Sequence, residues 1–135
     1  MSSIETVYGE RIAERLCDAI EALGAATAAY QTTGDALTGL AAQRRDTQQH
    51  HDAVEEQMRA LFLAAPDLGK NDRERAANLA MHLRFHPDLA ARRVALTDAQ
   101  ERHEEAERAH KSAYHHMESL RVAITGYAAV LGATH

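Results

Sequence analysis

The longest regular pattern of apolar positions lies in the second half of the chain, from Pro87 to about Leu131. Apolar, small and a few polar residues recur there in alternating steps of three and four. The stripe consists of Leu89, Arg92, Leu96, Ala99, His103, Ala106, His110, Ala113, Met117, Leu120, Ile124, Tyr127 and Leu131. This heptad spacing is typical of a helix that packs lengthwise on other helices. Because no Gly or Pro interrupts it before Gly126, we predict one helix over about residues 87–131, about 65 Å long.

Two further helical patterns precede it. Ser2 or Ser3, with Glu5 at capping-box spacing, predicts a helix start that continues to about residue 31. Its expected inward face is Ile4, Tyr8, Ile12, Leu16, Ile20, Leu23, Thr27 and Tyr30. The segment Thr32-Thr33-Gly34-Asp35 then resembles a helix cap and restart, although a kinked continuous helix is the alternative.

The second predicted helix covers about residues 34–64, with a stripe formed by Leu37, Leu40, Arg44, Thr47, His51, Val54, Met58 and Leu61. A loop at 66–70 ends it. Asn71 is placed to cap a short helix over about 72–85. The sequence His86-Pro87-Asp88 stops that helix and starts the long one, because Pro favours the first helical turn.

These patterns predict an all-α fold in one domain over residues 1–135: an elongated antiparallel bundle, or coiled-coil hairpin, of three long helices plus one short helix. Aligning the apolar ends of the two stripes places His51 opposite His103 and Arg44 opposite His110. The long helix then extends past its partners. We therefore expect its last apolar turns to form the interface of a homo-oligomer, through Leu120, Ile124, Tyr127 and Leu131.

Composition narrows the setting of the protein. The net charge of −5 argues against a surface that is basic throughout, as a nucleic-acid coat would be. The single cysteine, Cys17, cannot form an intramolecular disulfide and is expected to be a small core residue. No signal peptide pattern is present, and no apolar run approaches the roughly 20 residues that cross a bilayer. We expect a cytoplasmic protein that needs no cofactor and does not bind a membrane.

Histidine is unusually frequent, with nine in the chain. On the long helix His103, Glu107 and His110 lie at i, i+4 and i+7, where side chains of one helix can reach a common metal. A di-iron bundle needs a second Glu-x-x-His pair, and the chain has none, so a single transition-metal site is the metal interpretation. The simpler interpretation is a polar layer that fixes helix register, and a pH-sensitive interface is the third.

A second candidate is a basic surface around the short helix. Its members are Lys70, Arg73, Arg75, Arg84, Arg92 and Arg93. Nearby His82, Phe85 and His86 offer rings on which a base can stack, and the helix start at Asn71 offers amides to a phosphate. The alternative is a solvated face of Glu–Arg pairs. No phosphate-binding loop, zinc cysteine pair or nucleophile beside a histidine is present, so we do not expect an enzyme.

One stretch has a familiar pattern: Gly69-Lys70-Asn71, the Pro-Asp-Leu start at Pro87, an Ala/Glu-rich long helix, and Leu120-Arg121 near its end. It resembles small helical-hairpin proteins of unknown activity that bacteriophages and prophages encode. The resemblance covers the second half of the chain and implies no catalytic residues.

The sequence thus favours a non-enzymatic, oligomeric helical adaptor that binds itself and another protein. The first alternative is an accessory nucleic-acid-binding protein that uses the Lys70–Arg93 surface. The second alternative is a metal-binding bundle at His103, Glu107 and His110.

Overall fold

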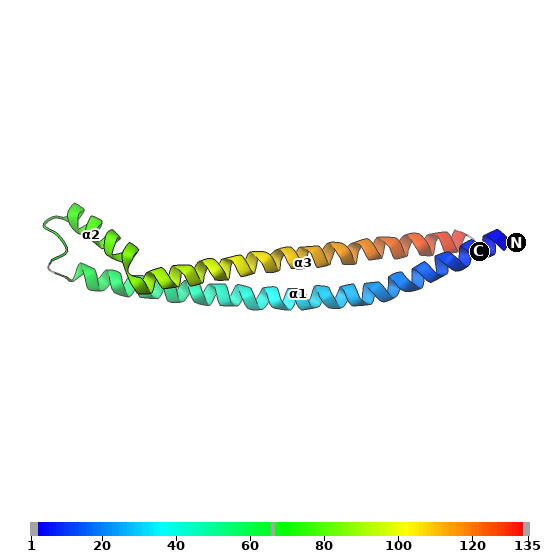
Figure 1. Cartoon of the computed structure of the whole chain (residues 1–135), viewed down its shortest axis with the longest axis horizontal. Helices are drawn as coiled ribbons and strands as arrows, with labels where there is room; N and C mark the ends of the chain where they lie inside the picture. The colour runs from blue at the N-terminus through cyan, green and yellow to red at the C-terminus, as the bar shows by residue number, and fades with distance from the viewer. Residues whose placement is uncertain (1–2, 66, 134–135) are drawn as a thin grey trace. The chain divides into compact units, whose positions relative to one another are not determined.

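The computed structural model describes residues 3–65 and 67–133, and it contains three helices in that part of the chain (Figure 1). They are α1 (Ser3–Leu63), α2 (Asp72–Phe85) and α3 (Pro87–Ala133). The all-α prediction is confirmed, whereas the predicted count of three long helices and one short helix is wrong. Ser2 and Pro66, which we assigned to a cap and a loop, lie outside the described residues.

The two predicted N-terminal helices, about 3–31 and 34–64, are one continuous helix. The Thr32 hydroxyl donates to the carbonyl of Ala28 (2.9 Å), and the Thr33 hydroxyl donates to that of Tyr30 (3.0 Å). Threonines that bond back to the preceding turn are compatible with a helix interior. The described glycines, Gly34 included, all have negative φ. The segment Thr32-Thr33-Gly34-Asp35 is therefore part of the helix interior and does not start a new helix.

The chain divides into two compact units. The first contains residues 1–37 and 106–135, and the second contains residues 38–105. In the first unit, the beginning of α1 and the end of α3 run antiparallel and side by side (Figure 1). In the second unit, the remainder of α1 packs with α2 and the beginning of α3.

The predicted stripe of α3 is confirmed. Every position in it from Leu89 to Leu131 is buried or half-buried, and most of the intervening residues are exposed. Alternating steps of three and four keep these positions on one side of the helix, because their average of 3.5 residues is close to one helical turn.

The predicted face of the N-terminal helix is partly wrong. Tyr8 and Ile20 are exposed, whereas Ala19 and Ala26 are buried with Ile12. The prediction took consecutive steps of four from Ile4 to Ile20, and each such step advances about 40° beyond a full turn. The face therefore drifted away from the stripe that the structure buries. In the second predicted stripe, Leu61 is also wrong: it is 72% exposed, whereas the adjacent Phe62 is half-buried.

The core of the second unit forms at the α2–α3 corner. It consists of Leu68, Leu79, Leu83 and Leu89, against which Val54, Met58 and Phe62 pack. Asn71 caps α2, as predicted, by accepting a hydrogen bond from the Glu74 amide (2.8 Å). At Gly69 a Cβ atom would lie 2.9 Å from the Arg75 nitrogen, so a glycine is needed where the loop approaches α2.

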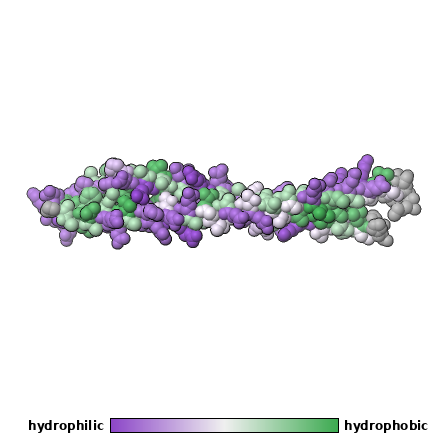
Figure 2. Space-filling view, turned by 90° about the horizontal axis from the view of Figure 1, so that it is seen from below, coloured by the Kyte–Doolittle hydropathy of each residue, from purple (hydrophilic) through white to green (hydrophobic). Residues whose placement is uncertain are grey.

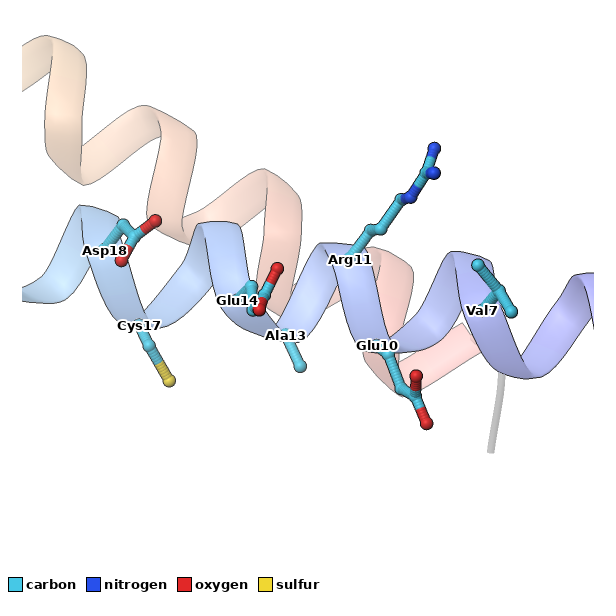
Figure 3. Close-up of a pocket in the computed structure, with 7 residues that line it drawn as sticks. All are labelled: Val7, Glu10, Arg11, Ala13, Glu14, Cys17 and Asp18. Carbon is cyan, nitrogen blue, oxygen red and sulfur yellow. The ribbon is translucent and has the colours of Figure 1, made fainter.

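Cys17 lies on the outer face of α1. It is exposed, which contradicts the core assignment, and Figure 3 shows its side chain pointing away from the neighbouring helix. It lies beside an open depression on the outer face of α1, whose lining is largely charged. None of the described helices is apolar over a length sufficient to cross a membrane.

Leu89→Ala should destabilise the protein by about 2–5 kcal/mol, because it removes a side chain that is only 1% exposed and leaves a cavity. Leu61→Ala is the matched control, since its side chain is 72% exposed and should change stability by less than about 0.5 kcal/mol. Urea unfolding followed by circular dichroism measures both. Equal losses would show that the α2–α3 corner is not a core.

Candidate functional site

Two residues of the predicted basic surface, Arg75 and Arg93, donate hydrogen bonds to backbone carbonyls at helix ends. Arg93 Nη2 donates to the carbonyls of Leu83 (2.6 Å) and Arg84 (3.0 Å), at the end of α2. Arg75 Nη2 donates to the carbonyl of Leu63 (2.9 Å), at the end of α1. Carbonyls in the last turn of a helix lack intrahelical partners, so each guanidinium completes a helix end.

The other four predicted members are distributed differently. Lys70, Arg73 and Arg84 are exposed, and Arg92 is half-buried in the α3 stripe. The Arg84 guanidinium carbon lies 5.5 Å from the centre of the Phe85 ring. These three exposed cations share the corner with acidic residues at the starts of α2 and α3, Asp72, Glu74 and Asp88. The six basic residues outnumber these three carboxylates, so the corner keeps a positive balance, although two of the guanidinium groups are engaged with helix-end carbonyls.

Apolar rather than basic character dominates the outer face of α2. Met81 and Phe85, one helical turn apart, are 59% and 68% exposed. They line an open depression with Asn78, His82, His86 and Pro87. The His82 ring stacks on Phe62 (4.8 Å between centres), and His86 Nδ1 accepts a hydrogen bond from the Asp88 amide (3.2 Å). Both histidines thus contact neighbouring elements at the corner while they line this depression.

The expected partners of the central histidines are wrong. His103 Nδ1 lies 3.3 Å from Arg44 Nη1, within the second unit, and the predicted partner was His51. Arg44 precedes His51 by seven residues, which is one heptad. Shifting one helix by a heptad brings an equivalent position of the stripe opposite His103. The periodicity alone therefore does not distinguish the two registers.

His110 is enclosed by α1 within the first unit. Its ring stacks on Tyr30 (4.5 Å between centres, 18° between planes), and its Nδ1 lies 3.0 Å from the Thr33 hydroxyl. That hydroxyl also lies 3.0 Å from the Tyr30 carbonyl, and when it donates there it accepts from His110 in the tautomer that carries Nδ1–H. Gly34 completes the site: a Cβ atom there would lie 3.2 Å from His110 Cε1.

The structure does not bring the predicted ligands His103, Glu107 and His110 to one position. His103 Nδ1 faces a guanidinium, which would repel a cation, and His110 Nδ1 faces Thr33. Among the described residues one other group has suitable ligand atoms close together: His51, Asp52 and Glu55. Sequence spacing offered a signal for this group, since His51 and Glu55 are at i and i+4.

The Asp52 carboxylate has a lowered pKa. Hydrogen bonds from His51 and from Gln48 (2.9 Å to Gln48 Nε2) hold its pKa below its ordinary value. A carboxyl whose pKa is lower in the folded state adds stability above its unfolded pKa. That contribution is lost as the pH falls through the folded value. Asp52 is therefore anionic at neutral pH.

The predicted oligomer residues have a partner within the chain. Leu120, Ile124, Tyr127 and Leu131 are half-buried in the first unit, where α1 supplies the facing helix. The assumption that the last turns of α3 are bare is wrong, because the N-terminal helix continues without a break and reaches them. The exposed large apolar side chains of this unit are instead Val7, Tyr8, Ile20, Tyr114, Val122 and Val130.

Replacing Arg93 by Gln should lower the free energy of unfolding by about 1–2 kcal/mol, since it removes a charged donor from two helix-end carbonyls. Arg73→Gln is the control, because Arg73 is exposed, and its effect should stay within about 0.5 kcal/mol. Denaturant unfolding of the two variants at one salt concentration makes the comparison. If both lose the same stability, Arg93 does not act as a cap.

Gly34→Ala and Gly39→Ala form a second matched pair in α1. Alanine at Gly39 meets no atom within 4 Å and should stabilise the helix by about 0.5–1 kcal/mol. Alanine at Gly34 should give no such gain, because the His110 ring must shift away from Thr33. Thermal unfolding measures both variants, and an equal gain at Gly34 would show that His110 is not held there.

Comparison with known proteins adds no relative from which a function can be transferred. No family model matches the chain, and no curated protein or solved structure matches it. The resemblance to phage helical-hairpin proteins stays a prediction. The activity of the protein must therefore be inferred from its own side chains and contacts.

Proposed function

We propose that this protein is a non-catalytic, homo-oligomeric interaction protein. The observation that carries the proposal is the thin core of the first unit. Its buried apolar side chains among the described residues are Ile12, Ala19, Ala26 and Met117. Two of these four are alanines, so the pair of helices gains little from apolar burial.

The α1 helix leaves part of the α3 stripe uncovered. The α3 residues Leu120, Ile124, Tyr127 and Leu131 are half-buried, so α1 covers only part of each. On one face of this unit, apolar surface gathers beside the grey chain ends (Figure 2). Two helices can cover only one side of such a stripe, whereas a second pair completes a four-helix core. Self-association through this unit is the arrangement that removes the surface from water.

The second unit supplies the contact for a different protein. Met81 and Phe85 project from α2 beside the depression at Asn78 and Pro87. An aromatic and a methionine side chain on a helix face are typical of surfaces that accept an apolar segment of a partner. Self-association by one unit and recognition by the other together describe an adaptor.

Nucleic-acid binding is the weaker proposal for the same corner. Arg75 and Arg93 are engaged with helix-end carbonyls, and the exposed Lys70, Arg73 and Arg84 are accompanied by carboxylates. With a net charge of −5, the remainder of the surface repels a polyanion. Binding that falls steeply with salt and weakens in Lys70→Gln and Arg73→Gln would favour this alternative.

Native mass spectrometry and light scattering at micromolar concentrations should show an oligomer. Ile20→Glu should shift it toward monomer, because this 54% exposed side chain flanks the stripe of the first unit. Ala25→Glu is the control. Ala25 is exposed on α1, and the residues one heptad before and after it, Asp18 and Thr32, are polar. A monomeric wild-type protein at these concentrations contradicts the proposal.

The same preparation tests the adaptor surface. A Met81→Glu, Phe85→Glu double variant should keep the oligomer and lose capture of the partner protein from the native cell. Loss of the oligomer in this variant would place self-association at α2 instead. Retained capture would remove α2 as the recognition surface.

A further inference from the structure

The group formed by His51, Asp52 and Glu55 on α1 has the geometry of a metal site. His51 Nδ1 lies 3.2 Å from Asp52 Oδ1 and 3.8 Å from Glu55 Oε2. All three ligand atoms lie within 4.8 Å of one another. Zinc–ligand bonds of about 2.0–2.2 Å place the ligands of a tetrahedral site about 3.4 Å apart, which the two measured distances bracket.

The side chains are held in this arrangement by neighbours on the same helix. Arg59 Nη2 takes the other Glu55 oxygen, Oε1, at 2.9 Å, so Oε2 faces His51. Gln48 Nε2 donates to Asp52 Oδ1 at 2.9 Å. Hydrogen bonds of this kind orient metal ligands and strengthen binding. Metal ligation uses the carboxylate form of Asp and Glu side chains.

The His51 side chain is the least exposed part of the group. It is 13% exposed, whereas the side chains of Glu55 and Asp52 are 34% and 60% exposed. His51 and Glu55 border an open depression of the second unit whose lining includes Ala80, Leu83 and Leu89. A half-buried imidazole beside apolar side chains, with two carboxylates toward solvent, leaves room for water on a bound ion.

We propose that His51, Asp52 and Glu55 bind a divalent transition-metal ion, with zinc as the best fit. One imidazole nitrogen and two carboxylate oxygens provide three protein ligands, and water completes the tetrahedron. The ion neutralises the two carboxylates, which lie close together. Ligation through Nδ1 requires the tautomer that carries its proton on Nε2.

This site differs from the predicted trio on α3. There His103 Nδ1 faces Arg44 and His110 Nδ1 faces Thr33, whereas His51 Nδ1 faces two carboxylates. The basic side chains nearest the proposed site need consideration, because Arg84 and Arg93 line the same depression. Arg93 is held by the Leu83 and Arg84 carbonyls, and Arg84 lies over Phe85, so contacts elsewhere engage both guanidinium groups.

The test uses the full chain without an affinity tag, titrated with Zn²⁺ by calorimetry and with Co²⁺ by visible absorption. Wild-type protein should bind one ion per chain, and the cobalt form should show the intense bands of tetrahedral coordination. His51→Ala and Asp52→Asn should each weaken binding by about tenfold or more, since even changes around metal ligands cost that much.

His50→Ala is the matched control. His50 is the adjacent histidine, but its Nδ1 lies 2.8 Å from the Asp46 carbonyl, and its replacement should change affinity less than about twofold. Circular dichroism verifies that each variant is folded, and Glu55→Gln provides a second test if His51→Ala unfolds. An absence of binding, an octahedral cobalt spectrum, or binding that depends on His103 rather than His51 would each overturn the proposal.

Discussion

A two-helix layer can bury only one stripe on each helix, and the structure of the first unit follows from this constraint. The α1 and α3 helices meet along positions that repeat in steps of three and four. Among the residues whose burial is described, Ile12, Ala19, Ala26 and Met117 alone become buried there. In the second unit α2 adds a third element, and Leu89 becomes almost completely buried with Leu68, Leu79 and Leu83. The two units thus differ in how complete their cores are, and the proposed self-association concerns the less complete one.

Histidine has no single role in this protein. His82 stacks on Phe62, His86 accepts from the first turn of α3, His103 contacts Arg44, and His110 fits against Tyr30 and Thr33. Each of these rings has a different partner. Residue spacing alone did not distinguish these partners, and it predicted a single polar layer. His51 differs from these four, because its Nδ1 lies near the carboxylates of Asp52 and Glu55. The same residue type therefore serves helix ends, stacking and a candidate ligand set within a single short chain.

The elements that could be predicted are those governed by local rules. The stripe from Leu89 to Leu131, the Asn71 cap and the start of α3 at Pro87 depend on periodicity and on capping chemistry. The sequence left open whether the helix restarts or continues at Thr33 and Gly34, because the contacts that these residues make with His110 on α3 are not visible in a local capping signal. Nor could the sequence reveal that Arg75 and Arg93 bind carbonyls of Leu63 and Leu83, since those contacts depend on how helix ends meet.

Gly34 has a consequence for how the helices of the first unit align. A repeat of seven residues allows one helix to slide along the other by one heptad and find similar neighbours again. Sliding by one heptad would bring Thr27 or Ala41 to the place of Gly34. Both carry a Cβ atom, and only the glycine leaves a notch that the His110 ring fills. The periodic stripe alone is compatible with several registers of the two helices. The absence of a Cβ atom at Gly34 favours the one register in which the His110 ring packs there.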